Sequence, residues 1–126
     1  MLPTPDLTWS LRIDRVTVGD VHVFAPVGRV GTLSSGGLIE ALTGPIKAGT
    51  PRMVVDLAGV DYISSAGLLA LQSVAARVHD SGGDLVLCGL VEPVRVAFDL
   101  AGLLAEFAVE PSREQALARL SERRAG

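Results

Sequence analysis

Apolar and polar residues alternate over residues 11–18 and again over 21–27, the pattern typical of two neighbouring β-strands. The alternation slips once in the first segment, which leaves room for a bulge. Gly19 and Asp20 lie between the segments and suit the tight turn of a β-hairpin. We therefore predict an N-terminal hairpin, preceded by a loose arm over residues 1–8, which contain two prolines.

Helical patterns then alternate with short apolar runs along the rest of the chain. Apolar residues recur three or four positions apart, as on one face of a helix, in residues 32–48, 66–79, 93–102 and 112–120. Nearly continuous apolar runs, typical of buried strands, occupy residues 52–57, 84–88 and 107–109. This order implies parallel strands joined by right-handed crossovers. We predict an α/β fold in one domain, residues 1–126: a mixed β-sheet, with an N-terminal hairpin and then parallel crossovers, packed by about four helices.

Local signals refine the ends of the first and last helices. Gly44 and Pro45 interrupt the first helical segment and predict an irregular C-terminal end. Ser112 and Gln115 have the spacing of a capping box, which would open the last helix. That helix is expected to leave residues 121–126 as a loose tail.

Ser64 and Ser65 stand where the second predicted helix begins, after a short turn that contains Asp61. A hydroxyl at a helix N-terminus lies beside unpaired backbone N–H groups and the positive end of the helix dipole. Two roles are open for Ser65: it can cap the helix, worth ~0.5–2 kcal/mol, or it can carry a phosphate. The next two residues, alanine and glycine, are small and leave the backbone accessible to another protein.

Size and composition narrow the class of protein. The 126 residues fit one domain, 48% of them are apolar, and no apolar run approaches the ~18 residues of a membrane span. The formal net charge is −3 without a basic stripe, which disfavours nucleic acid as the partner. Cys88 is the only cysteine and cannot form an internal disulfide, and the N-terminus lacks the pattern of a signal peptide. We expect a cytoplasmic domain that does not insert into a membrane.

Side chains with catalytic potential are few and scattered. Asp56 ends a strand and Asp61 lies in a turn, where hydrogen bonds to backbone N–H groups are a simpler role than metal binding or acid–base catalysis. Cys88 lies in a run that should be buried, which favours an inert thiol. His22 and His79 are far apart, and the sequence has no nucleotide-binding loop. We expect no enzyme activity, and no metal or cofactor bound by the chain itself.

Charged residues of the last two predicted helices are expected to face solvent. Arg95 and Asp99 are spaced for an exposed i,i+4 ion pair. Arg113 and Arg119 belong to a charged set that suggests a solvated helix face. Leu100 is instead expected to pack in the core or at its edge.

Several of these features together resemble the sulfate transporter and anti-sigma factor antagonist (STAS) domains. The resemblance rests on the strand over 52–57, the Ser64-Ser65-Ala66-Gly67-Leu68 turn, the Gly82-Gly83 stop, the strand over 84–88, and the block over 93–103, which contains Phe98-Asp99-Leu100-Ala101-Gly102-Leu103. It covers residues 11–120, nearly the whole chain. It is greatest for the stand-alone bacterial antagonists of anti-sigma factors.

The resemblance implies a phosphorylation switch, because Ser65 matches the position that such antagonists present for phosphorylation. An anti-sigma factor that is also a serine kinase, with its own bound ATP, would bind while Ser65 is unmodified. Phosphorylation of Ser65 would end the interaction and a serine phosphatase would restore it, which regulates sigma-factor-dependent transcription. The implied contact surface consists of Ser64, Ser65, Ala66, Gly67, Leu68, Arg29 and Gly31. A homodimer stays an open alternative.

The chain departs from the common antagonist pattern at three positions. Gly31 stands where many antagonists have an acidic residue, Ser64 where many have aspartate, and Ala66 where a second serine is frequent. If those acids assist the kinase, phosphorylation would be slow, would depend on a particular partner, or would be absent. Two other roles stay open: an accessory subunit on the cytoplasmic side of a membrane transporter, and a scaffold in a stress-sensing assembly.

Overall fold

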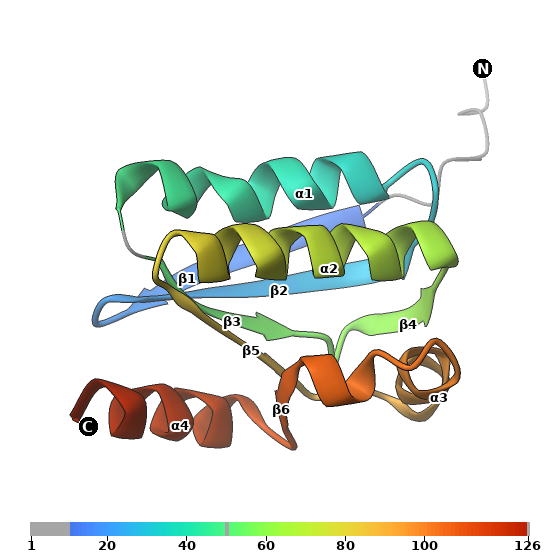
Figure 1. The fold of residues 1–126 in the computed structure, drawn as a ribbon. Helices are drawn as coiled ribbons and strands as arrows, with labels where there is room; N and C mark the ends of the chain where they lie inside the picture. The colour runs from blue at the N-terminus through green and yellow to red at the C-terminus, as the bar shows by residue number, and fades with distance from the viewer. Residues whose placement is uncertain (1–10, 50, 126) are drawn as a thin grey trace.

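The computed structural model describes residues 11–49 and 51–125, and the backbone alone for residues 48 and 123–125. The arm predicted for residues 1–8 lies outside this range. Six strands form one mixed sheet in the order β1-β2-β3-β5-β6, and β4 pairs with β2 beside this path (Figure 1). The strands are β1 (Leu11–Val18), β2 (Val21–Val30), β3 (Arg52–Asp56), β4 (Val60–Ile63), β5 (Asp84–Cys88) and β6 (Ala108–Glu110).

The strand directions confirm the predicted mixed sheet. β1 and β2 form an antiparallel hairpin, whereas β2 with β3, β3 with β5, β5 with β6 and β2 with β4 are parallel pairs. The hairpin register runs along all of β1 without a break, so the expected bulge does not form. The slip instead marks the point at which the apolar side chains of β1 change from one face of the strand to the other. Leu11 and Ile13 pack against the main core, whereas Val16 and Val18 lie on the opposite face of the strand and are exposed.

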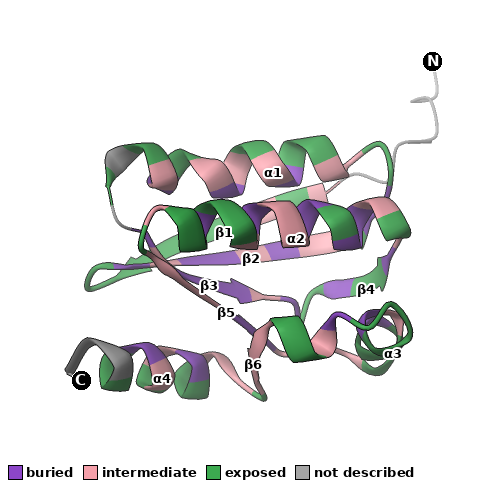
Figure 2. Ribbon diagram, in the orientation of Figure 1, coloured by how far each residue is buried: buried purple, intermediate pink, exposed green. Residues whose placement is uncertain are grey.

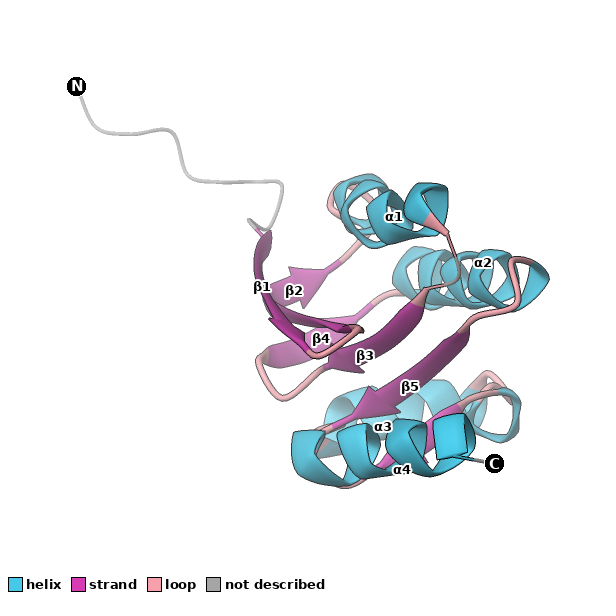
Figure 3. Ribbon diagram, turned by 90° about the vertical axis from the view of Figure 1, so that its left-hand side faces the viewer, coloured by secondary structure: helices cyan, strands magenta, loops and turns pink. Residues whose placement is uncertain are grey.

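Helices cover both faces of the sheet, as Figures 1 and 3 show. The helices are α1 (Ser35–Thr43), α2 (Ser65–Asp80), α3 (Glu92–Leu100) and α4 (Arg113–Ala125), with two 3-10 helices, η1 (Gly44–Ala48) and η2 (Leu104–Glu106). α1 and α2 lie side by side over one face, α4 lies over the other, and α3 packs beside β4. None of the described helices is both long and apolar enough to cross a membrane.

The core is divided between these two layers. Met53 and Val55 of β3 point into the larger cluster of apolar side chains, under α1 and α2, whereas Val54 points into the smaller cluster under α4. In the smaller cluster it meets Ala116 and Leu120 of that helix. Both faces of β3 are therefore covered, which explains why its sequence is continuously apolar.

β4 is the element that the sequence pattern did not reveal, because its four residues read as part of a turn. β2 is ten residues long, and only its first part, Val21 to Phe24, pairs with β3. The C-terminal part of β2 is therefore available for a second parallel partner, and β4 pairs with it. Asp61, predicted in a turn, is an exposed residue of this strand.

The helix ends follow the local signals with one exception. The first helix continues as the tighter turn of η1, which contains Pro45, so the predicted irregular end is confirmed. The Gln115 N–H donates to Ser112 Oγ at 3.2 Å, which confirms the cap of α4. The tail predicted for residues 121–126 is wrong as far as residue 125, because α4 continues through it.

Two arginines of α4 tie the helix to the sheet, contrary to the solvated face expected for them. Arg113 Nε donates to Asp56 Oδ2, and Arg119 Nη1 donates to Glu110 Oε2, both at 3.0 Å. The two acids lie at the C-terminal ends of β3 and β6, and α4 passes over these strands. The ion pairs therefore fix where the helix lies on the sheet.

Candidate functional site

The serine turn, residues 64–67, joins β4 directly to α2 at one end of the sheet (Figure 1). The Ser64 N–H donates to the Val30 carbonyl at 2.8 Å, which extends the pairing of β4 with β2 by one residue. At the other end of β4 the Gly28 N–H donates to the Gly59 carbonyl at 2.9 Å. The start of α2 is therefore held against the end of β2, beside the loop that leads to α1.

The two serines of the turn have different roles. Ser64 is the N-cap: its backbone is extended (φ −87°, ψ 172°), and its Oγ accepts a hydrogen bond from the Gly67 N–H at 3.2 Å. Ser65 is the first residue of α2, it is exposed, and no described residue forms a hydrogen bond with its hydroxyl. The cap therefore belongs to Ser64 and not to Ser65.

The surroundings of the Ser65 hydroxyl favour an anion. The backbone N–H groups of Ser65 and Ala66 are in the first turn of α2, where the helix itself offers them no carbonyl partner. These groups carry the positive end of the helix dipole. The first turn of α2 contains no acidic residue that would oppose an added negative charge.

Gly67 and Leu68 support the turn from beneath, and neither adds a side chain to its surface. A Cβ at position 67 would lie 2.7 Å from Val30 Cγ1 and 2.7 Å from Ile63 Cγ1, so only glycine lets α2 approach the sheet this closely. Leu68 is buried and packs in the larger core. Within the contact surface implied by the sequence, these two residues therefore offer a partner little or no side-chain area, and their role in binding stays a prediction.

On the β2 side of the turn, Gly31 is buried and Arg29 is exposed. The Gly31 N–H donates to Ser34 Oγ at 2.9 Å, and this hydroxyl donates to the Arg29 carbonyl at 3.1 Å, which closes the loop. The Arg29 guanidinium carbon lies 5.1 Å from the centre of the Tyr62 ring, a cation–π contact worth ~0.5–1 kcal/mol at an exposed site. Arg29 therefore places a positive charge on the strand that holds the turn.

Four large apolar side chains on the elements around the serine turn are exposed, and the sequence analysis did not single them out. They are Leu33, Tyr62, Leu69 and Leu100, with exposed fractions of 69%, 37%, 63% and 84%. They come from the β2–α1 loop, β4, α2 and α3, and these elements lie at the end of the molecule where α2 begins (Figures 1 and 2). Leu69 follows Ser65 by about one helical turn and so lies on the same side of α2. We call these four residues the apolar surface.

A signal for Leu69 was present in the sequence. The buried stripe of α2 contains Leu68, Leu71 and Val78, and Leu69 falls outside it. A leucine outside the buried stripe of an amphipathic helix must face solvent or a partner.

α3 corrects two expectations. Leu100, expected in the core or at its edge, is instead exposed at the end of the helix, whereas Phe98 is buried in the core. Arg95 and Asp99 are both exposed, and they form no ion pair with each other or with another described residue.

The remaining candidates of the sequence analysis have structural roles. Asp56 Oδ1 accepts a hydrogen bond from the Ala58 N–H at 3.0 Å, and Asp56 Oδ2 accepts one from Arg113, so both carboxylate oxygens have structural partners. Asp61 is on a different strand and exposed. Burial raises the pKa of the Cys88 thiol to about 12, and the nearby Asp56 carboxylate adds to the shift. The thiol therefore stays protonated at neutral pH and is a poor nucleophile.

Comparison with known proteins identifies relatives of this arrangement. The STAS domain family matches residues 12–116. A protein of Bordetella bronchiseptica, BtrV, whose name describes it as a candidate anti-sigma factor antagonist, is 41% identical over 91 residues. The match covers 72% of this chain and 78% of the relative.

Solved structures share the fold. An anti-sigma factor antagonist from Mycobacterium paratuberculosis superposes with a TM-score of 0.76 at 24% identity, over 94% of this chain and 97% of the other. The anti-sigma factor antagonist SpoIIAA in its unphosphorylated form gives a TM-score of 0.76 at 15% identity, over 88% of this chain and 97% of the other. The phosphorylated form of SpoIIAA, from Bacillus, gives 0.66 at 13% identity, over 88% and 99%.

Proposed function

This chain belongs to the STAS domain family, and we propose that it acts as an anti-sigma factor antagonist with Ser65 as its switch. While Ser65 is unmodified, the protein binds an anti-sigma factor that is also a serine kinase, and a sigma factor is left free to direct transcription. Phosphorylation of Ser65 releases the anti-sigma factor. The observation that carries the proposal is the exposed Ser65 hydroxyl at the first position of α2, where Ser64 already provides the cap.

The relatives support both parts of this proposal. The proteins from Bordetella bronchiseptica and Mycobacterium paratuberculosis carry the description of anti-sigma factor antagonists. SpoIIAA, which has the same fold, exists in unphosphorylated and phosphorylated forms. A domain with this fold is therefore a suitable carrier of a phosphorylation switch.

The modification is a phosphoryl transfer in which this chain supplies only the acceptor. Ser65 Oγ forms a bond to the γ-phosphorus of ATP held by the kinase, the bond from that phosphorus to ADP breaks, and the hydroxyl proton passes to a base of the kinase. A serine phosphatase reverses the change by hydrolysis: water supplies the oxygen that leaves with the phosphate, and Ser65 regains its proton. ATP is bound by the partner, and this chain needs no cofactor.

The fold tolerates the phosphate because of where it is added. A phosphoserine carries about −1.5 to −2 charges and three acceptor oxygens. The positive end of the α2 dipole favours an anion by ~0.3–1 kcal/mol. The Ser65 hydroxyl also has no hydrogen bond to a described residue that the modification would break.

A partner bound over the turn is affected in the opposite way. It would have to remove water from a dianion, and a like charge at ~4 Å costs about 4 kcal/mol at an effective dielectric constant of 20. Each ~1.4 kcal/mol lowers the affinity tenfold. Leu69 lies about one turn further along α2 on the same side, so an apolar contact of the partner there would be placed beside the new charge.

The serine at position 64 replaces the aspartate that many antagonists have before the phosphorylated residue. Serine and aspartate are both strong N-caps, so the structural part of this role is kept in the Ser64–Gly67 hydrogen bond. The negative charge is lost. The departure therefore changes the charge offered to the kinase and leaves the shape of the turn intact.

The experiment that tests the proposal is isolation of the protein from its native cells, followed by mass spectrometry of the protein and of whatever co-purifies. We expect phosphate on Ser65 in one fraction, and an ATP-binding anti-sigma factor bound to the unmodified fraction alone. A phosphorylated fraction that retains this partner at full occupancy would exclude the switch.

Ser65→Asp tests the same step without a kinase. The variant is expected to bind the anti-sigma factor at least about tenfold more weakly, because a carboxylate adds a charge under the partner. Ser65→Asn is the matched control of similar size without charge, and Ser121→Asp adds the same charge on the exposed surface of α4. Equal affinities for Ser65→Asp and Ser65→Asn would contradict the electrostatic mechanism.

A further inference from the structure

We propose that two copies of this chain associate through the open edge of β1, which pairs antiparallel with the same strand of the second copy about a two-fold axis at Val16. The proposal goes beyond the phosphorylation switch and does not rest on it. It starts from a long strand edge with which no described strand pairs, and from the exposed valines beside that edge.

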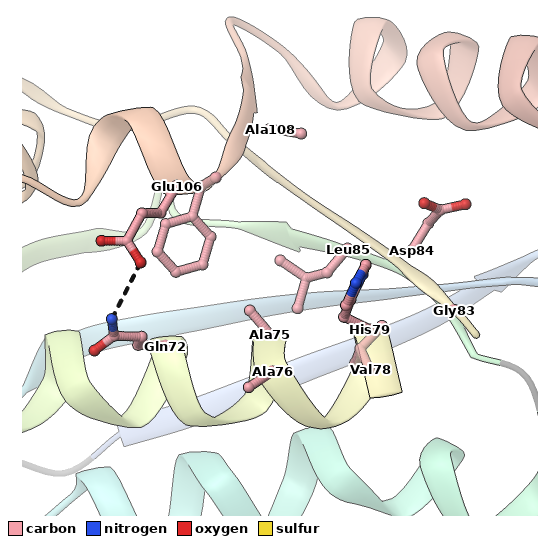
Figure 4. A pocket seen from close by; sticks show the side chains of 11 residues that line it. Gln72, Ala75, Ala76, Val78, His79, Gly83, Asp84, Leu85, Glu106 and Ala108 are labelled. Carbon is pink, nitrogen blue, oxygen red and sulfur yellow. Dashed lines mark hydrogen bonds between the residues drawn. The ribbon is translucent and has the colours of Figure 1, made fainter. Parts of the chain in front are cut away.

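β1 is an edge strand without the features that usually protect such an edge. It is the first strand in the order of the sheet, and among the described strands only β2 pairs with it. Its eight residues contain no proline or lysine, and its register with β2 has no bulge. The other edge strand, β6, has only three residues, and the segment before it is tied to α2 by a hydrogen bond from Gln72 Nε2 to Glu106 Oε1 at 3.2 Å (Figure 4). A long, regular edge such as that of β1 is a template for pairing with another strand.

The last residues of β1 present valines beside this open edge. Val16 and Val18 are 46% and 45% exposed. They lie opposite Val23 and Val21 of β2, which are buried in the smaller cluster under α4. The apolar side chains of this face of the sheet therefore continue past the buried cluster as far as the open edge of β1.

The charged side chains of β1 come before these valines and have partners within the chain. Arg15 points to the other face of the sheet, where its guanidinium carbon lies 5.3 Å from the centre of the Phe24 ring. Arg12 and Asp14 form an ion pair with each other, in which Nε lies 3.1 Å from Oδ1. The segment 16–18 itself carries no charge that would disfavour a second strand.

The backbone of β1 offers hydrogen bonds at the open edge. A β-turn joins the carbonyl of its first residue to the N–H of its fourth, so Val18 bonds to Val21 across the Gly19-Asp20 turn. Along an antiparallel pair, residues alternate between bonding to the partner strand and pointing away from it. The N–H and C=O groups of Thr17 and Arg15 are therefore directed outward, where a second antiparallel strand can pair with them.

The charges of β1 are compatible with a second copy of the same strand in one register. A two-fold axis perpendicular to the sheet keeps each face on the same side in both copies, so the axis passes between one residue and its own symmetry mate. An axis at Arg15 would place two arginines opposite each other, which is destabilising. An axis at Thr17 would pair only residues 16–18, because the strand ends at Val18. An axis at Val16 pairs residues 14–18 and places no like charges opposite each other.

In this register both the side chains and the backbone find partners. Val16 faces its own symmetry mate as a non-hydrogen-bonded pair, the closer kind of pair in an antiparallel sheet. Val18 lies diagonally across from the same valine, within contact distance of a long or branched side chain. Arg15 of each copy faces Thr17 of the other, and each of these pairs exchanges its N–H···O bonds. The interface is small, so the dimer should be weak and depend on concentration.

The interface leaves the serine turn accessible. Val16 and Val18 pair with the first part of β2, whereas the serine turn is bonded to Val30, the last residue of β2. Val23 and Val30 are ~23 Å apart along the strand, at ~3.3 Å per residue. The dimer would therefore carry two serine turns, and each would be open to a partner.

The test is sedimentation velocity of the full chain at concentrations up to the millimolar range. We expect an equilibrium between monomer and dimer. Val16→Lys should weaken the dimer at least about tenfold, because two like charges then meet at the axis and the valine contact is lost. Val96→Lys on α3 is the matched control, since Val96 is 43% exposed, and it should leave the equilibrium unchanged.

Two outcomes of this experiment would overturn the proposal. A chain that stays monomeric throughout would leave the edge of β1 to a strand of another protein. A Val16→Lys variant that dimerises as strongly as the parent would place the interface on another surface.

A mixture of variants tests the register. Val16→Glu alone should dimerise as weakly as Val16→Lys, whereas an equimolar mixture of the two should regain the dimer, because lysine and glutamate then meet at the axis. A mixture without this gain would exclude an axis at Val16.

Thr17→Pro tests the hydrogen bonds of the edge. The N–H of this residue is directed away from β2, so proline should preserve the fold and weaken the dimer. A folded Thr17→Pro variant with unchanged association would exclude pairing through this edge. Ser65→Asp should dimerise as the parent does, because the serine turn lies outside the interface, and loss of the dimer in this variant would contradict that placement.

Discussion

Ser64 and Ser65 are chemically identical neighbours, and their surroundings give them different properties. The hydroxyl of Ser64 points back toward the helix and satisfies the Gly67 N–H. Ser65 follows this N-cap residue and is already helical, so its hydroxyl does not cap the helix. The Ser65 side chain is exposed. The structural and the modifiable hydroxyl are therefore on separate residues, which permits each to be changed alone.

Alanine at each serine should separate the two roles. Ser64→Ala is expected to lower the free energy of unfolding by about 0.5–2 kcal/mol, because the Gly67 N–H loses its partner. Ser65→Ala should change it by less than about 0.5 kcal/mol, as is usual for an exposed side chain without contacts. Urea denaturation of the two variants and the parent measures both values. A larger loss for Ser65→Ala than for Ser64→Ala would show that the cap is misassigned.

Cys88 provides a second prediction at this scale, through its raised pKa. Because burial raises the pKa of the folded thiol from its ordinary value near 9 to about 12, the unfolded chain loses this proton first as the pH rises. The contribution of Cys88 to stability is therefore fully present below about pH 9 and is lost between about pH 9 and pH 12. Denaturation midpoints of the parent and of Cys88→Ala across this range should converge as the pH increases. A constant difference would contradict the shift.

At the scale of elements, the position of α2 depends on one close approach. Gly67 lies where the helix passes over Val30 and Ile63, and both of these side chains are buried and branched at Cβ, so they cannot move aside easily. The distance between α2 and the end of β2 is thus set by the absence of a side chain at one position.

Gly67→Ala should therefore destabilise the fold although alanine is the better helix former. The gain in helix propensity is ~1 kcal/mol, and the strain of overpacking is typically ~1–3 kcal/mol, so we expect a net loss of up to about 2 kcal/mol. Gly37→Ala on α1 is the matched control, since nothing lies within 4 Å of the added methyl group, and it should stabilise by about 0.4–1 kcal/mol. Thermal or urea unfolding compares them. Stabilisation by both substitutions would mean that α2 can move away from the sheet.

The elements themselves were largely predictable from the sequence, and the exceptions have a common cause. Periodicity located the four helices, and continuous apolar runs located the buried strands. β4 shows neither a continuous apolar run nor an alternation, because its two middle residues are both exposed, and it exists because the far end of β2 offers backbone groups for pairing. Similarly, the ion pairs of Arg113 and Arg119 depend on acids brought near by the sheet. In each case the partner is distant in sequence.

The candidate site was predictable only in part for the same reason. The position of Ser65 at the start of a helix followed from local sequence. Which serine caps the helix depends on the backbone angles of Ser64, and the burial of Gly31 and Leu68 depends on tertiary packing. The four residues of the apolar surface come from four different elements, and their exposure depends on how those elements pack.

At the scale of the whole molecule, the proposed switch acts on binding and leaves the fold unchanged. Stoichiometrically phosphorylated protein should keep its thermal midpoint or raise it by no more than about 5 °C at low salt, since the helix dipole contributes ~0.3–1 kcal/mol. The difference should shrink at high salt, because the phosphate is exposed and its charge is screened. Calorimetry of both forms at two salt concentrations measures this. A marked fall of the midpoint on phosphorylation would indicate that the modification acts by unfolding.

The hydrogen bond between Ser64 and Gly67 limits how many phosphorylated forms of the protein can exist. Because the Ser64 hydroxyl is directed toward the helix, an approaching kinase meets only the hydroxyl of Ser65. Each molecule is therefore either phosphorylated or unphosphorylated at this turn, and no doubly phosphorylated form arises. The intact mass of the population would then show two peaks and no third. The ratio of kinase to phosphatase activity would then set the fraction of molecules in each of these two states.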